Sequence, residues 1–132
     1  MITKDPIRLD KELADVLDTD NGAVVVFTGV VRADAIEGRR VDRIHYDCYQ
    51  EMAAGEMSLL IDQIRAESGV TSIRALHRVG DVPAGEISLL VVVTAGHRGE
   101  AYDASRKVVE EIKHRVPIWK KEIYDDGSSQ WL

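Results

Sequence analysis

The spacing of apolar and polar residues in the first part of the chain predicts one helix, two strands and a loop. Apolar residues recur at helical spacing over 9–17, which predicts a short helix. The segment 23–32 is rich in β-branched residues and almost continuously apolar, as expected of a strand covered on both faces. The charged, glycine-containing segment 33–40 predicts a mobile loop, and a second strand should follow over 41–49.

The remaining sequence alternates between helical and extended periodicity. The expected elements are an amphipathic helix over 51–68, strands over 70–79 and 86–94, a helix over 99–115 and a strand over 118–124. Pro and Gly residues over 80–85 predict a hairpin turn between the two adjacent strands. The second long helix must stop before Pro117, because proline cannot continue the helical hydrogen bonding.

The order of these elements predicts an α+β fold. From Val41 onward the order is strand, helix, strand, strand, helix, strand, which is the split βαβ or ferredoxin-like arrangement. With the N-terminal helix and strand added to this core, we expect the α/β-hammerhead type, with two helices on one face of a largely antiparallel sheet. A chain of 132 residues with 45% hydrophobic and 30% charged residues fits one domain spanning residues 1–132.

The distribution of charge favours a small anionic ligand. The net charge of −6 argues against nucleic acid or an anionic membrane as the main partner. The segment 97–121, however, holds seven Lys or Arg against four acidic residues and so carries +3, while the remainder, with ten against nineteen, carries −9. A modestly basic segment on an acidic protein suits a small anion held in one place. The alternative is that these charges are only the solvated face of a helix.

The chain has the features expected of a cytoplasmic protein. Its longest apolar runs, Ala23–Phe27 and Ile87–Val93, fall well short of the ~20 residues of a membrane-spanning helix. The first residues lack the apolar stretch of a secretory signal. Cys48 is the only cysteine, which excludes an internal disulfide and suits a reducing compartment.

The sequence offers no metal site and no sulfur nucleophile of its own. His45 and Cys48 are close in sequence, but an offset of three residues places them on opposite faces of a strand. Cys48 shares a face with Ile44 and Tyr46, so it is expected to be a small buried apolar residue rather than a nucleophile. Sulfur chemistry would therefore need an outside donor.

Two groups of basic residues are candidates for an anion site. His97 and Arg98 stand where a strand ends and a helix begins, and helix N-termini bind anions through free N–H groups. Lys113 precedes Pro117 and Lys120 follows it, so a chain reversal could bring both lysines to one pocket. The alternatives are a hydrogen-bonded turn for His97 and ordinary surface lysines.

Several sequence blocks resemble, in order and spacing, the large, catalytic subunit of molybdopterin synthase. The blocks are Gly22–Arg32, Tyr46–Ala53, His77–Gly80, His97–Arg98 and Lys113–Glu122. The resemblance covers roughly Gly22 to Trp131.

The resemblance implies an enzyme of molybdenum cofactor biosynthesis. Members of this family convert cyclic pyranopterin monophosphate, also called precursor Z, to molybdopterin by two sulfur transfers, without ATP, nucleotide or metal at this step. The sulfur comes from the thiocarboxylated C-terminal glycine of a small ubiquitin-like subunit. Two copies of the large subunit form a homodimer within a heterotetramer. No cofactor and no metal ligand are expected in this chain.

The resemblance also implies which residues form the site. The matching positions are the substrate-contacting active-site lysines Lys113 and Lys120, the anion-binding residues Arg32, His97 and Arg98, and the pocket-lining residues Val30, Val31, Lys121 and Glu122. Val30 stands where some members have a lysine. A competing hypothesis is a non-enzymatic ferredoxin-like module that binds a small anion and oligomerises.

Overall fold

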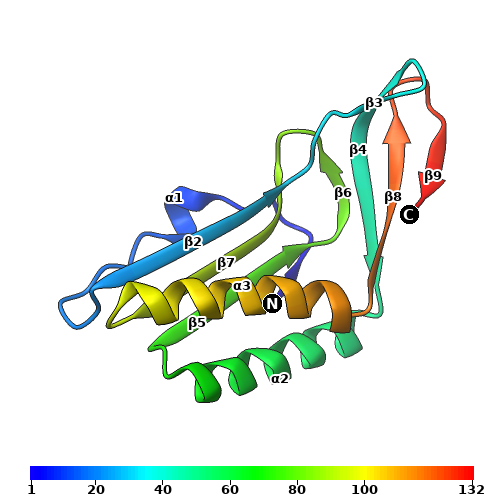
Figure 1. The fold of residues 1–132 in the computed structure, drawn as a ribbon. Helices are drawn as coiled ribbons and strands as arrows, with labels where there is room; N and C mark the ends of the chain where they lie inside the picture. The colour runs from blue at the N-terminus through cyan, green and yellow to red at the C-terminus, as the bar shows by residue number, and fades with distance from the viewer.

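The computed structural model describes residues 1–132 and contains two β-sheets and two long helices (Figure 1). In chain order the elements are β1 (Ile2–Thr3), α1 (Leu9–Glu12), β2 (Ala23–Val30), β3 (Ala35–Ile36), β4 (Arg39–Cys48), α2 (Gln50–Ser68), β5 (Ser72–Arg78), β6 (Gly80–Pro83), β7 (Ile87–Ala95), α3 (Arg98–Arg115), β8 (Ile118–Tyr124) and β9 (Ser129–Trp131). None of the helices has the length and apolar character that crossing a membrane requires.

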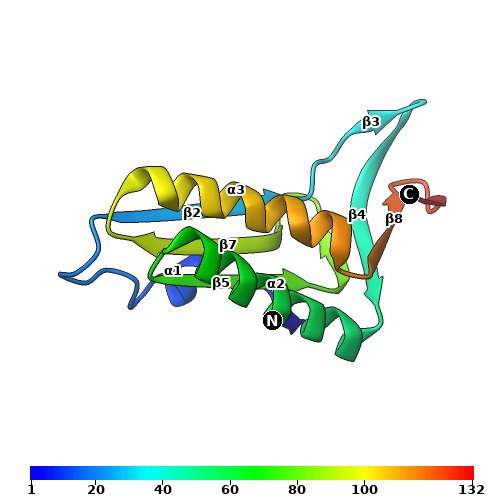
Figure 2. The ribbon, with the colours of Figure 1, turned by 60° about the horizontal axis from the view of Figure 1, so that its bottom comes forward.

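The first sheet carries both long helices on one face (Figure 2). Its strand order is β1-β5-β7-β2, with β7 antiparallel to both neighbours and β1 parallel to β5. The central strand β7 is buried over almost its whole length, and Met57 and Leu60 of α2 and Val108 of α3 are fully buried beneath the sheet. This apolar layer is the main core of the molecule.

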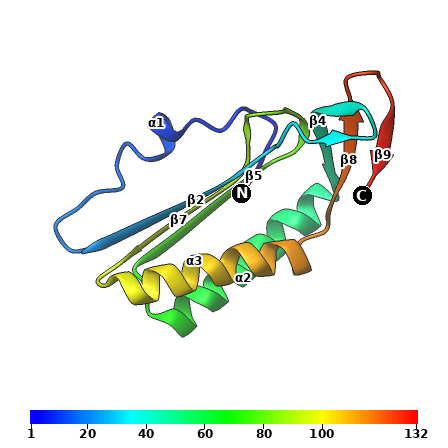
Figure 3. The same ribbon diagram turned by 45° about the horizontal axis from the view of Figure 1, so that its top comes forward.

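The second sheet stands beside the first at the end where α3 finishes (Figure 3). Its strand order is β3-β4-β8-β9, and β6 pairs with β4 as well. The chain passes from the first sheet to the second at Gly80, whose positive φ of 85° favours glycine. A separate small core of Val31, Val41, Val82 and Tyr124 fills this part of the molecule.

The α+β class and the main elements predicted from the sequence are confirmed. Both long helices begin within a residue of the expected position and pack on one face of a largely antiparallel sheet. Gly69 ends α2 in the left-handed conformation with φ 71°, and α3 ends two residues before Pro117. The strand over 118–124 has the predicted bounds.

The predicted single ferredoxin-like sheet is not confirmed. In that arrangement β4 would lie beside β7, but β2 takes this edge of β7 and β4 pairs with β8 in the second sheet. The predicted turn over 80–85 contains β6, which adds to β4, and β9 was not predicted.

Three predictions for the first forty residues are wrong. The first helix spans only Leu9–Glu12 and buries no residue, because so short a helix lacks an apolar face to dock. The strand β2 is an edge strand covered on one face, with Val26 and Val30 exposed by 39% and 47%. The segment 33–40 is a hairpin rather than a mobile loop: Glu37 and Gly38, both with positive φ, form its two-residue turn.

Candidate active site

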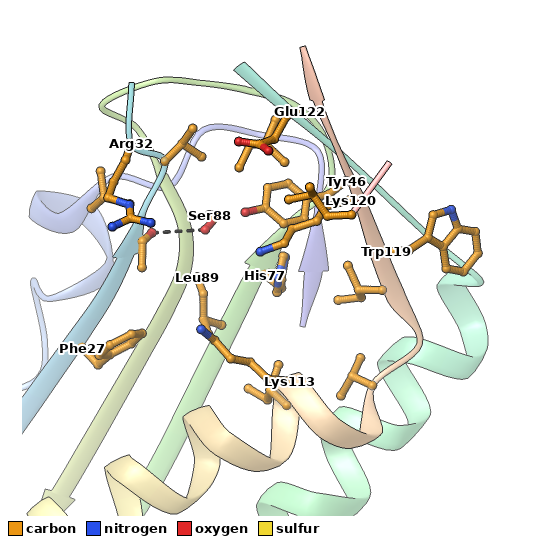
Figure 4. A pocket seen from close by; sticks show the side chains of 18 of the residues that line it. Phe27, Arg32, Tyr46, His77, Ser88, Leu89, Lys113, Trp119, Lys120 and Glu122 are labelled. Atoms are coloured by element: carbon orange, nitrogen blue, oxygen red, sulfur yellow. Dashed lines mark hydrogen bonds between the residues drawn. The ribbon is translucent and has the colours of Figure 1, made fainter. Parts of the chain in front are cut away.

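A cavity of about 600 Å³ opens where the two sheets meet the end of α3 (Figure 4). Its lining comes from elements far apart in the sequence: β2 and the residues after it, β4, β5, β7, α3 and β8. One wall is apolar and includes Phe27, Leu89, Ile112, Val116 and Ile118. A ligand with both a flat or apolar part and an anionic part therefore fits this space.

Three cationic side chains line the cavity from three different parts of the chain. Arg32 follows β2, Lys113 lies in the last turn of α3, and Lys120 lies on β8. The lysines form no ion pair within the chain, while Arg32 makes one exposed pair with Asp34 at 3.2 Å. Lys113 is favoured at its position by the partial negative charge of the helix C-terminus, so the fold can hold this cation at little cost.

The reversal at Pro117 places the two lysines around one space. Helix α3 ends at Arg115, and β8 begins at Ile118 and runs back along β4. Figure 4 shows Lys113 reaching into the cavity from the helix and Lys120 reaching in from the strand. Two unpaired cations in one cavity repel each other, so the arrangement is suited to an anion between them.

Strand alternation separates Lys121 from its two neighbours. Lys120 and Glu122 line the cavity, whereas the Lys121 ammonium lies 5.0 Å from the centre of the Trp131 ring and does not line it. Glu122 also accepts a long hydrogen bond of 3.4 Å from the Tyr124 hydroxyl. Val30 and Val31, the other two expected pocket residues on this side, do line the cavity.

A comparison with protein families identifies the chain's relatives. The model of the family described as MoaE protein matches residues 2–115. The chain belongs to this family.

Similar proteins of this family carry one functional name. The molybdopterin synthase catalytic subunit of Oryza sativa subsp. indica is 44% identical over 122 residues, which cover 91% of this chain and 63% of the rice protein. The chain thus spans less than two thirds of the rice protein's length. The protein of the same name from Pyrococcus abyssi is 37% identical, with 91% of this chain and 80% of that protein covered.

A solved structure of the family shares the fold. The crystal structure of molybdopterin synthase from Staphylococcus aureus matches 99% of this chain and 94% of that chain, with a TM-score of 0.89 and 35% sequence identity. The arrangement of two sheets and three helices is therefore the arrangement of a molybdopterin synthase chain.

Besides Lys121, two more of the residues expected at the site do not line the cavity of this MoaE-family chain. His97 precedes α3 and Arg98 begins it, whereas Lys113 lies in its last turn. Sixteen helical residues span about 24 Å at ~1.5 Å per residue, so neither His97 nor Arg98 reaches the cavity of its own chain. Both side chains are exposed and neither lines the cavity.

The structure adds polar residues that the sequence reasoning missed. His77, on β5, and Tyr46, on β4, line the cavity with their rings 5.1 Å apart in an edge-to-face arrangement. Burial raises the pKa of the Tyr46 phenol, so this group is a neutral hydrogen-bond donor. Only the resemblance of the blocks Tyr46–Ala53 and His77–Gly80 pointed to this region, and no spacing rule linked either residue to the lysines.

Cys48 and the metal-ligating side chains are the remaining candidates considered from the sequence. The thiol of Cys48 does not line the cavity, and burial is the main cause that raises its pKa, which disfavours the reactive thiolate. No three His, Cys, Asp or Glu side chains gather in a way that could hold a metal ion.

Proposed function

We propose that the chain is the catalytic subunit of molybdopterin synthase. In this proposal it converts cyclic pyranopterin monophosphate to molybdopterin, taking two sulfurs from the thiocarboxylated C-terminus of a small ubiquitin-like subunit. The observation that carries the proposal is the cavity itself. It places Arg32, Lys113 and Lys120 next to an apolar wall in a chain that is acidic overall.

The chemistry of the cavity fits this substrate and this donor. A pterin ring is flat and matches the apolar wall, and its phosphate matches the cations. The thiocarboxylate is a second anion, and an extended glycine tail is slender enough to enter the cavity beside the pterin. The names of the family relatives point to the same reaction.

Each site residue has a proposed role. Lys113 and Lys120 hold the anionic groups and orient the reacting atoms, Arg32 binds phosphate at the rim, and Glu122 orients Lys120 or the pterin. Val30 and Val31 form the edge of the pocket. Lys121 contributes from the opposite face of β8, through the positive potential it adds to this end of the molecule.

The positions of His97 and Arg98 suggest how they take part. They are exposed at the far end of α3 from the cavity, so we propose that they bind substrate in the cavity of a second copy. This agrees with the proposed assembly, a homodimer of this chain at the centre of a heterotetramer with two small subunits.

The fold and the setting can be proposed in finer detail. The order of elements from β4 to β8 supports an α/β-hammerhead description, a split βαβ core whose outer strands have moved to the second sheet. A cytoplasmic setting suits a chain with one free thiol, Cys48.

Reconstitution tests the proposed reaction. The chain is mixed with a small ubiquitin-like subunit that carries a C-terminal thiocarboxylate and with cyclic pyranopterin monophosphate, and the pterin products are measured. Formation of molybdopterin with loss of two thiocarboxylates per pterin supports the proposal. The competing hypothesis, an anion-binding module without catalysis, predicts bound pterin and no conversion.

A further inference from the structure

His77 is a buried polar residue of the cavity to which no role has been assigned. Its side chain is only 8% exposed, yet it lines the cavity. Figure 4 shows its imidazole in the middle of the site, close to the Tyr46 ring and the amine end of Lys120. A histidine at this depth, facing a cavity, is placed to contact a bound reactant.

One hydrogen bond determines which nitrogen of His77 is free. Nδ1 lies 2.8 Å from the backbone carbonyl oxygen of Arg78. A carbonyl oxygen only accepts, so Nδ1 carries the hydrogen and donates it. The lone pair of the neutral ring is therefore on Nε2, which has no hydrogen-bond partner within the chain. The edge-to-face packing on Tyr46 limits rotation of the ring.

The surroundings of His77 favour its neutral form. Burial is the largest cause that lowers its pKa, and the positive charges of the Met1 amine and of Lys120 lower it further. The hydrogen bond to the Arg78 carbonyl acts in the opposite direction and is outweighed. Tyr46, the remaining titratable contact, is neutral, and the Arg78 guanidinium pairs with Glu86 at 2.7 Å. At neutral pH, Nε2 is thus available to accept a proton.

The proposed reaction needs such a proton acceptor. Once the carrier's sulfur has bonded to a pterin carbon, a thioester joins the carrier to the pterin. Release of the carrier from this thioester requires water to add to the acyl carbon: an O–H bond of water breaks and a C–O bond forms. The C–S bond then breaks with its electron pair moving to sulfur, which stays on the pterin, and the carrier leaves as a carboxylic acid that gives its remaining proton to solvent. Two groups of the cavity lining are candidates to accept the proton of that water, the His77 imidazole and the Glu122 carboxylate.

We propose that Nε2 of His77 is the general base for this hydrolysis. It accepts the proton of the attacking water, becomes imidazolium and returns the proton to solvent before the next cycle. The nearby cations hold the carrier and the pterin and stabilise the developing oxyanion. This inference rests on the proposed function, because the thioester forms only if the chain transfers sulfur from a thiocarboxylate.

The test uses the variant His77→Asn and a matched control. The asparagine amide can replace the Nδ1 hydrogen bond to Arg78 but has no lone-pair nitrogen at the position of Nε2. The control is His114→Asn on α3. The Nδ1 of His114 lies 2.8 Å from the carbonyl oxygen of Glu110, but the ring is exposed and lies outside the cavity. Thermal unfolding of both variants checks that the fold is kept.

Single-turnover experiments with the thiocarboxylated carrier and the pterin separate two steps by intact-mass analysis. Formation of the covalent carrier–pterin adduct should be nearly unchanged in His77→Asn. Its release should slow by about 10²- to 10⁴-fold, so that the adduct accumulates. In the wild type, release should be constant near neutral pH and should decline only as the pH falls below about 6.5, because the pKa of His77 is lowered, whereas the variant should lack this decline. His114→Asn should behave like the wild type.

Other outcomes overturn the inference in distinguishable ways. Wild-type release without a decline at low pH, or equal release in His77→Asn and the wild type, would remove His77 as the base. If Glu122→Gln instead abolishes the pH dependence while His77→Asn keeps it, the base is Glu122. If the wild type forms neither adduct nor product, the proposed function itself fails. If the His77 variant does not fold, the wild-type and Glu122→Gln profiles decide the question: a decline that persists in Glu122→Gln supports His77, and a wild-type profile without a decline overturns the inference.

Discussion

Replacing Lys113 by alanine tests the cavity as an anion site. The side chain is exposed, forms no ion pair within the chain and lies in the last turn of α3. Losing a cation from a helix C-terminus typically costs about 0.3–1 kcal/mol of folding free energy. The nearby positive charge of Lys120 offsets part of this loss. The free energy of unfolding should therefore change little, and any loss of activity comes from the site.

The expected loss of activity follows from simple electrostatics. An ammonium and an anion ~4 Å apart attract each other by about 4 kcal/mol per unit charge at an effective dielectric of 20. Arg32 and Lys120 line the same cavity and keep part of this attraction. We therefore expect kcat/KM for pterin conversion to fall about 100- to 1000-fold, which corresponds to about 2.7–4.1 kcal/mol at ~1.36 kcal/mol per tenfold.

Two further variants make this measurement decisive. Lys113→Arg keeps the charge, so it should recover most of the rate if Lys113 only holds an anion and little if its amine takes part in the chemistry. Lys107→Ala is the control, because Lys107 is on the same helix but pairs with Glu67 at 3.0 Å outside the cavity. Urea unfolding checks stability in each case. Wild-type turnover by Lys113→Ala together with a large loss in Lys107→Ala would refute the assignment of the cavity as the anion-binding site.

Three further predictions concern stability, each measured by urea unfolding. Met57→Ala should cost about 2–5 kcal/mol, because Met57 is fully buried in the main core; an unchanged midpoint would contradict that packing. Gly22→Ala should cost about 1–3 kcal/mol, since its new Cβ would lie 2.6 Å from the Gly96 carbonyl oxygen, whereas the Cβ of Gly99→Ala would meet no neighbouring atom at a residue without a positive φ. Stability should decline as the pH falls below about 6.5, because the pKa of buried His77 is lowered and the unfolded chain takes up that proton first; His77→Asn should lessen this decline.

The two long helices were predictable because their signals are local. The apolar spacing of α2 and α3 and the stop signals at Gly69 and Pro117 depend on residues within a few turns. A short strand that forms only by pairing with a distant segment has no such local signal in the sequence. The segment 80–83 reads as a turn from its Pro and Gly content, and only the presence of β4 beside it makes it a strand.

The candidate site was predictable where neighbouring elements determine it. The reversal at Pro117 brings Lys113 and Lys120 to one cavity, as expected from a helix followed directly by an antiparallel strand. His97 was expected there too, but it lies at the opposite end of α3. His77 was missed, because its place in the cavity depends on how the first sheet meets the second, which local spacing does not encode.

The pairing of the two sheets has a consequence for the order of events during folding. The strand β2 pairs with β7, and β4 pairs with β8, so each early strand waits for a partner that lies far later in the chain. Contacts of such large sequence separation slow folding, typically into the millisecond-to-second range. During synthesis the edge of β2 that pairs with β7 stays exposed until β7 emerges from the ribosome, and the edge of β4 that pairs with β8 stays exposed until β8 emerges. The cavity, which is lined by residues from Phe27 to Leu132, can therefore close only at the end of this process.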